Sequence, residues 1–185
     1  TTEIYTLSLH DALPILLLDM PAEKLMEYEG IGPAKALELT ACRELIKRAS
    51  YQQLAEEDVI NSPARLKDWL VNYIGHLEQE HFVLVYLDHR HHVKGYRQLF
   101  QGANNAVSIN PADLFRSALK AGARSLIIAH NHPGGSPLPS LADDMTTRDL
   151  CEAGELMGIP IIDHVVVCRS GTFSYREHGL IRQFT

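Results

Sequence analysis

Two histidines and an aspartate stand close together in this chain and could bind one metal ion. His130 and His132 are separated by a single residue, and Asp143 follows after a loop rich in proline and glycine. Zinc accepts imidazole nitrogen and carboxylate oxygen at about 2.0–2.2 Å, and a catalytic zinc site leaves its fourth position to water. The three residues could therefore supply three ligands of a catalytic zinc ion, which predicts a metal-dependent hydrolase.

A buried strand is expected to carry the two histidines. Segment 125–129 is short, apolar and partly β-branched, and His130 and His132 stand at its C-terminal end. Side chains at positions i and i+2 of an extended chain point to the same side, so both imidazoles can face one ion while Asn131 points away. Strand ends of this kind are where α/β folds usually bind ligands.

A helix is expected to carry the aspartate. Ser140 and Asp143 have the spacing of a capping box. The helix that they begin is predicted to reach about Met157. Its expected apolar side consists of Thr146, Leu150, Ala153 and Met157. Ser-x-x-Asp by itself is only a common cap, so the metal hypothesis depends on the histidines and the aspartate occurring together.

The run from His130 to Asp143 resembles the JAMM motif of the MPN metalloprotease domains, in which His-x-His, seven residues and Ser-x-x-Asp follow one another. The stretch HNHPGGSPLPS is similar to the bacterial RadC family in particular. This resemblance runs from about residue 16 to the end of the chain. It also includes GIGPAKA (30–36), EHFVLVYLD (80–88), DHVVV (163–167) and FSYREHGLI (173–181).

The resemblance implies roles for the matching residues. The zinc ligands would be His130, His132 and Asp143, and Ser140 would help to stabilise the developing oxyanion. Glu80 would be the general acid/base that polarises the zinc-bound water. In this scheme zinc lowers the pKa of water to about 7, and the carboxylate passes a proton to a leaving amine. The implied enzyme is a zinc-dependent metallopeptidase or isopeptidase, although the ligand set alone would serve other hydrolyses too.

Glu80 has two alternatives. It opens the apolar strand expected at 82–87, as the family pattern requires, whereas Glu78 stands two residues too early for that strand. Glu80 could also be a solvated charge at the end of a helix. His164 fits the family sequence as well and is expected to support the site without being a ligand.

Composition limits the remaining possibilities. A chain of 185 residues is long enough for one domain with a core and a small appendage, and its net charge of −6 creates no general attraction to nucleic acid. It has no apolar stretch of membrane-spanning length. The three cysteines, Cys42, Cys151 and Cys168, form no Cys-x-x-Cys pair. This favours a reducing cytoplasm and argues against a zinc deaminase. Cys42 and Cys151 are expected in the core.

Three regions are predicted along the chain. Residues 1–15 resemble a non-native leader, residues 16–50 form a helix-hairpin-helix segment, and residues 62–185 form the MPN/JAMM metallohydrolase domain. The fold class is α/β, with a mixed sheet flanked by helices as in JAMM/MPN and cytidine-deaminase-like folds, after a small all-α N-terminal segment. Residues 51–61 are expected as a polar link. The other elements expected in the domain are helices at 63–76 and 111–121 and strands at 82–87, 93–100, 160–167 and 172–175.

The N-terminal segment could contact DNA. Helices are expected at 21–28 and 33–48, and Gly30 and Gly32 between them, with Lys35 near the start of the second helix, could meet a phosphate backbone. The alternative is that Gly-x-Gly only allows the two helices to pack. A DNA-associated repair or recombination accessory protein with a structural or vestigial metal, or a metal-dependent nuclease, therefore stays an alternative to the peptidase. A further histidine cluster, at residues 89–92, is expected to face solvent.

Overall fold

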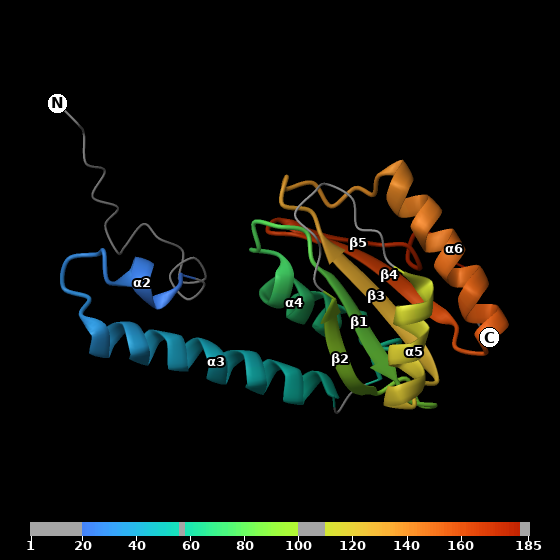
Figure 1. Ribbon diagram of the computed structural model, residues 1–185, viewed down its shortest axis with the longest axis horizontal. Coiled ribbons are helices and arrows are strands. Elements are labelled where there is room, and N and C mark those ends of the chain that lie inside the picture. Colours follow the sequence, from blue (N-terminus) through green and yellow to red (C-terminus); the bar gives the residue numbers. More distant parts are fainter. Residues whose placement is uncertain (1–19, 56–57, 100–109, 182–185) are drawn as a thin grey trace. The chain divides into compact units, whose positions relative to one another are not determined.

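The computed structural model describes three stretches of the chain, residues 20–55, 58–99 and 110–181 (Figure 1). The expected leader, residues 1–15, lies outside them. The chain divides between Ser50 and Tyr51 into two compact units. No helix in the described stretches is long and apolar enough to cross a membrane.

The first unit is a small helical hairpin. Helix α2 (Ala22–Leu25) is shorter than expected, because residues 26–30 form turns in which Gly30 has a φ of +84° that favours glycine. Its apolar residues gather in a cluster of Leu25, Ile31 and Ala36. The hairpin therefore has a small core of its own.

Helix α3 (Pro33–Ala55) is longer than expected and takes in part of the stretch predicted as a link. Residues 49–55 contain neither glycine nor proline, so nothing in the sequence stops the helix there. Leu54, in its last turn, is buried in the core of the second unit. Cys42 is exposed on this helix, so its prediction as a core residue was wrong: the surrounding helix is polar and presents no consistent apolar face there.

A mixed sheet of five strands forms the centre of the second unit, as predicted. The strands are β1 (Phe82–Leu87), β2 (Val93–Leu99), β3 (Ser125–Asn131), β4 (Ile161–Cys168) and β5 (Gly171–Ser174). They lie in the order β2-β1-β3-β4-β5. The β3–β4 pair is parallel and the other three neighbouring pairs are antiparallel. The central strands are buried on both faces, which explains their nearly continuous apolar sequences.

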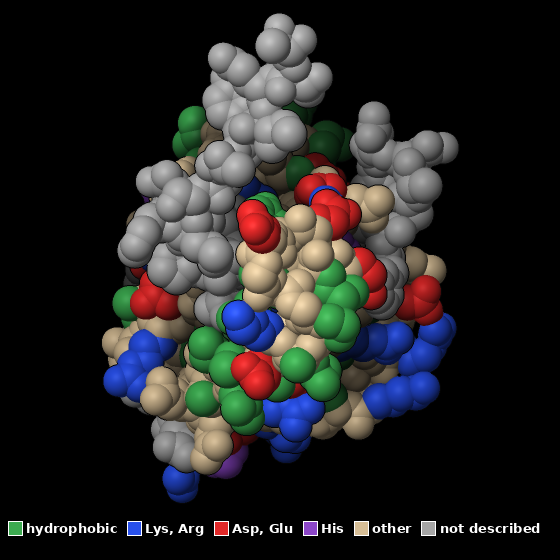
Figure 2. All heavy atoms as spheres, turned by 90° about the vertical axis from the view of Figure 1, so that its left-hand side faces the viewer, with side chains coloured by type: hydrophobic (Ala, Val, Ile, Leu, Met, Phe, Trp, Pro, Cys, Tyr) green, Lys and Arg blue, Asp and Glu red, His purple; other side chains and the backbone are tan. Residues whose placement is uncertain are grey.

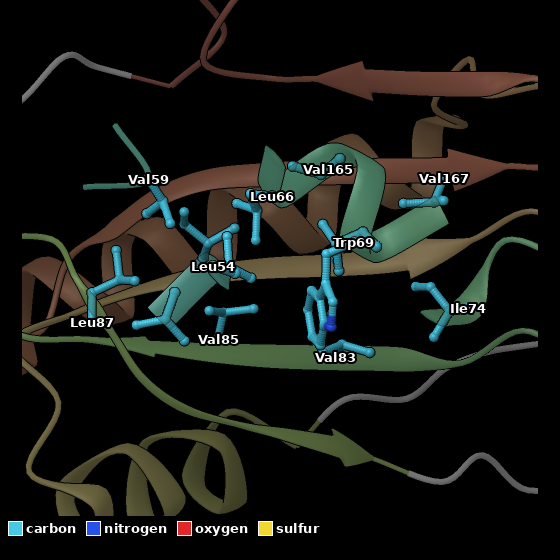
Figure 3. Close-up of a cluster of buried hydrophobic side chains, with 14 of the residues drawn as sticks. Leu54, Val59, Leu66, Trp69, Ile74, Val83, Val85, Leu87, Val165 and Val167 are labelled. Atoms are coloured by element: carbon cyan, nitrogen blue, oxygen red, sulfur yellow. The ribbon is translucent and has the colours of Figure 1, made fainter. Parts of the chain in front are cut away.

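Helix α4 (Pro63–Ile74) covers one face of the sheet. Figure 3 shows its apolar side chains packed onto alternate residues of the strands. The labelled helix residues are Leu66, Trp69 and Ile74, and the labelled sheet residues are Val83, Val85, Leu87, Val165 and Val167. The period of two in β1 and β4 therefore defines which residues face this helix.

Helices α5 (Pro111–Ala121) and α6 (Leu141–Met157) contribute to the second core cluster, on the other face. The intervening residues of the strands, such as Leu84 and Ile128, pack in this cluster with Leu114 and Leu150. The buried side of α6 consists of Thr147, Leu150 and Gly154, whereas Met157 is 46% exposed. The buried side of α6 is thus offset from the expected stripe, and Gly154 allows a close approach of the Ile159 carbonyl just beyond the end of the helix.

Candidate metal centre

His130, His132 and Asp143 come together at the C-terminal end of β3. The Nε2 atoms of the two histidines are 3.0 Å apart. Asp143 Oδ1 lies 3.1 Å from His130 Nε2, and Asp143 Oδ2 lies 3.3 Å from His132 Nε2. Among the described residues, this is the group of three or more histidine, cysteine or acidic side chains that could hold a metal ion.

The two histidines are positioned by the sheet. His130 is the penultimate residue of β3, which runs past the expected end of that strand, and its side chain is 5% exposed. Just beyond the strand, the His132 backbone N–H donates to Val167 O of β4 at 2.8 Å. This bond continues the alternation, so both imidazoles lie on the side of the sheet that faces α6.

The first turn of α6 positions the carboxylate. Ser140 and Asp143 form the predicted capping box: Asp143 N–H donates to Ser140 Oγ, and Ser140 N–H donates to Asp143 Oδ2 at 2.7 Å. The Ser140 hydroxyl also donates to Asp143 Oδ2 at 2.7 Å. Burial alone would raise the pKa of the Asp143 carboxyl, but the hydrogen bond and charge of His130 and the bonds from Ser140 hold that pKa well below its usual range.

Buried His164 and Thr147 support His130 from behind. His130 Nδ1 lies 2.8 Å from His164 Nε2, and His164 Nδ1 lies 2.6 Å from Thr147 Oγ1. Burial lowers the pKa of His164 well below its usual range, and His130 lowers it further, so this imidazole is neutral and has one N–H.

The direction of each hydrogen bond in this series follows from the group at its end, the backbone carbonyl of Asp143. The Thr147 hydroxyl donates to the backbone oxygen of Asp143 at 2.6 Å, and a carbonyl can only accept. Thr147 Oγ1 must then accept from His164 Nδ1–H, and His164 Nε2 must accept from His130 Nδ1–H. In its neutral form His130 therefore has its lone pair on Nε2, the atom that faces the cluster, and a second proton there gives the charged form that hydrogen-bonds to Asp143.

His132 is held in the same tautomer by the loop before α6. Its Nδ1 lies 2.9 Å from the Ser136 carbonyl oxygen, which fixes the N–H on Nδ1 and the lone pair on Nε2. Gly135, with a φ of +84°, turns the loop so that this carbonyl faces back toward the histidine. His132 and Asp143 have side chains 18% exposed, so the cluster is accessible from solvent on this side.

The arrangement fits a divalent metal ion. Two imidazole lone pairs and a carboxylate face one another, which is favourable only with a cation or an added proton between them. Zinc–ligand distances of about 2.0–2.1 Å at the tetrahedral angle give ligand separations of about 3.3 Å. The two Nε2 atoms are 3.0 Å apart, and they lie 3.1 and 3.3 Å from the two different oxygens of the carboxylate. One ligand atom from each residue lies within 4.8 Å of the others, so the donor set could hold a small cation.

Glu80 lies two residues before β1 and is half-buried, whereas the alternative, Glu78, is exposed. β1 runs antiparallel to β3, and Phe82 pairs with His130. Glu80 stands outside the strand, so its place on the face of His130 is an expectation from side-chain alternation.

Comparison with known proteins agrees with this site. Residues 60–180, which include the whole cluster, match the RadC-like JAB domain. The chain belongs to the RadC-like JAB domain family. Its relatives include a UPF0758 protein of Leptothrix cholodnii, 39% identical over 165 residues that cover 89% of this chain and 74% of the relative. A UPF0758 protein of Photorhabdus laumondii is 36% identical over 165 residues, which cover 89% of this chain and 72% of the relative.

The hairpin residues of this RadC-like protein lie in the first unit, apart from the domain match. Lys35 Nζ donates to the Gly30 carbonyl at 3.0 Å, so its charge is directed back onto the turn, while Gly30 and Gly32 have open space around their Cα atoms. On the face seen in Figure 2, acidic, basic and hydrophobic side chains are interspersed. DNA contact by Gly30, Gly32 and Lys35 stays a prediction.

Sequence reasoning on the RadC-like chain missed one supporting residue and understated another. Thr147 had no motif to reveal it, although its position four residues after Asp143 places it one helical turn away. Asn131 was expected only to point away from the metal, yet it is fully buried and makes several hydrogen bonds.

Proposed function

We propose that this RadC-like protein is a zinc-dependent hydrolase of the JAMM type that cleaves amide or isopeptide bonds. The observation that carries the proposal is the convergence of two imidazole lone pairs and a carboxylate at separations of 3.0 to 3.3 Å. His130, His132 and Asp143 would hold the ion. Zinc bound there supplies Lewis-acid chemistry, which makes water more acidic and polarises a carbonyl oxygen.

The protein's own residues would handle the protons. Glu80 would accept the proton of the attacking water and deliver it to the leaving nitrogen, which suits a carboxylate on the face of His130. His164 and Thr147 would keep His130 in the tautomer that binds metal.

Ser140 would contribute in two ways. As the helix cap it holds Asp143 in place, and its hydroxyl donates to that carboxylate. To stabilise an oxyanion, this hydroxyl would have to turn its hydrogen from Asp143 toward the substrate. Its structural role is thus the better supported of the two.

The choice of an amide or isopeptide substrate rests on the likeness of the motif to metalloprotease domains. The same donor set could assist phosphodiester cleavage, so DNA is the necessary comparison substrate. The net charge of −6 gives no particular support to a nucleic-acid substrate.

The test is to load the protein with zinc and to incubate it separately with mixed peptides, an isopeptide-linked dipeptide and DNA. Glu80→Gln should abolish amide cleavage while one zinc ion per chain remains bound, and Glu78→Gln is the matched control that should leave cleavage intact. Cleavage of DNA alone would replace the proposal by the nuclease alternative. No cleavage of any substrate, with DNA binding that survives His130→Ala, would favour the accessory alternative.

A further inference from the structure

Asn131, the residue between the two histidines, ties their strand to the segment that carries Glu80. Its side chain is 0% exposed and lies on the opposite face of the sheet from His130. Its Nδ2 donates to the carbonyl oxygens of Leu77 and Gln79 at 3.1 and 3.0 Å. Its Oδ1 accepts from the backbone N–H of His81 at 2.6 Å. The amide thus uses both of its donors and its acceptor on one short segment.

That segment, residues 77–81, connects α4 to β1 and has little regular structure of its own. The contacts of Asn131 fall on both sides of Glu80, at Gln79 and at His81. The Asn131 backbone N–H also donates to the His81 carbonyl at 3.3 Å. Four hydrogen bonds from one residue of β3 therefore fix the backbone around the glutamate.

A second contact braces the same segment from the neighbouring strand. His81 Nδ1 lies 2.6 Å from Gln98 Nε2, and Gln98 Oε1 accepts from the Tyr73 hydroxyl at 2.9 Å. His81 is thus held by β2 through its side chain and by β3 through its backbone. This leaves Glu80 between fixed neighbours.

The chemistry of this position favours asparagine. Two carbonyl oxygens require donors and one N–H requires an acceptor, and a buried group that lost its partner would be destabilised by its lost hydration. Aspartate would place an oxygen against the carbonyls of Leu77 and Gln79, and serine or threonine would be too short to reach all three groups.

We propose that Asn131 is a positioning residue that fixes Glu80 relative to the metal ligands on either side of it. The inference rests on the proposed function for the role of Glu80, but the clamp itself rests on the hydrogen bonds alone. Because His130, Asn131 and His132 are consecutive, one rigid stretch of β3 sets both the ligands and the glutamate segment. A reacting group held in this way needs no further ordering when substrate binds.

The first experiment measures amide hydrogen exchange at residues 78–81 in the full chain. Asn131→Ser and Asn131→Thr are both uncharged, and the threonine variant introduces a β-branched side chain, which suits a strand. Leu114→Ala, buried in the other core cluster, is the control for general destabilisation. Exchange should accelerate at least tenfold at His81 in the Asn131 variants and not in the control. Unchanged exchange would overturn the clamp.

The second experiment asks whether the clamp acts through Glu80. With cobalt(II) in place of zinc, the pH midpoint of the visible absorption change reports the environment of the ion. Glu80→Gln should shift this midpoint, each Asn131 variant should shift it in the same direction, and the double variant should shift it no further. Leu114→Ala should leave it in place.

The results separate the two proposals. A shift in Glu80→Gln without one in the Asn131 variants would reduce Asn131 to a structural residue and overturn its positioning role. If Glu80→Gln matches the wild type, the assigned role of Glu80 fails and the positioning role fails with it. The exchange data would still decide whether the clamp exists.

Discussion

The metal centre and the N-terminal hairpin both contain candidate ligand-binding residues, but they are held in different ways. At the candidate metal centre, His130 of β3 is buried and bonded to His164, which lies 34 residues away in the chain, and Asp143 comes from helix α6. In the hairpin, exposed Lys35 is bonded to the carbonyl of Gly30, only five residues away. One site is assembled from distant segments and the other from a single turn.

This difference shows which of the two motifs is held in place by contacts from several parts of the fold. The lone pairs at the metal centre converge because β3, β4, the loop before α6 and α6 itself all supply restraints. In the hairpin, the glycines and the lysine do not have to converge on one point. Changes at the metal centre should therefore alter ligand binding strongly, whereas changes in the hairpin should have small and local effects.

The largest effect is expected from His130→Ala. Zinc at a hundred times its Kd should raise the free energy of unfolding of the wild type by about 2.7 kcal/mol, because it binds only the folded chain. His130→Ala should lose this gain, since one imidazole ligand is missing. Thermal or urea unfolding with and without zinc measures it, and exposed His89→Ala is the matched control. An equal zinc effect in His130→Ala would refute the assigned ligand.

Thr147→Val should weaken zinc binding, by no more than the roughly 10- to 100-fold that is typical when the direct partner of a metal-bound histidine is removed, because Thr147 acts on His130 through His164. Without the hydroxyl, His164 Nδ1–H has lost its acceptor and no longer fixes the tautomer of His130. Competition with a chelator measures the affinity. Thr146→Val, one position away on α6, should bind zinc like the wild type; equal losses in both variants would point to helix packing instead.

Ser140→Ala should lower the free energy of unfolding by about 1 kcal/mol, because the N-cap bond of α6 is lost. Urea unfolding of the zinc-free protein measures this loss. In the zinc-loaded protein, the comparison of kcat with KM tests the oxyanion role. A lower kcat with an unchanged zinc affinity would support that role. If kcat and zinc affinity both fell, the role of Ser140 would be restricted to holding Asp143.

Asp163→Asn should change the acid dependence of stability. Burial raises the pKa of the Asp163 carboxyl, against hydrogen bonds from Ser174 and the Arg176 backbone that lower it. The folded protein therefore binds this proton more readily than the unfolded chain. This contribution to stability is full below the unfolded pKa of about 3.9 and is lost as pH rises through the folded pKa. Urea unfolding across this range should show the wild type losing stability relative to Asp163→Asn; parallel curves would contradict the raised pKa.

Lys35→Ala should have the smallest effect, within about 0.5 kcal/mol of the wild-type free energy of unfolding, because an exposed side chain loses one hydrogen bond. If the hairpin contacts DNA, the same variant should reduce the slope of log affinity against log salt concentration by about 1, the loss of one phosphate contact. DNA binding measured at several salt concentrations tests this, with exposed Lys24→Ala as a control. A loss of zinc binding in Lys35→Ala would break the contrast between the two regions.

Much of the metal centre could be predicted because its signals are local. The one-residue spacing of His130 and His132 only needs an extended chain, and the spacing of Ser140 and Asp143 only needs a helix start. The extent of helix α3 and the exposure of Cys42 were harder to predict. The end of that helix is decided by the burial of Leu54 against a distant core and not by a stop signal.

Residue type and short spacing were enough to predict the candidate ligand set, the alternation that turns Asn131 away from the histidines, and the mixed α/β architecture. The residues that support the site became visible only in the folded chain. Thr147 reaches His164, and Asn131 reaches Gln79 and His81, through contacts between elements that no local pattern encodes. Such contacts depend on how α6 and the segment before β1 pack against the sheet, and packing is a property of the whole folded chain.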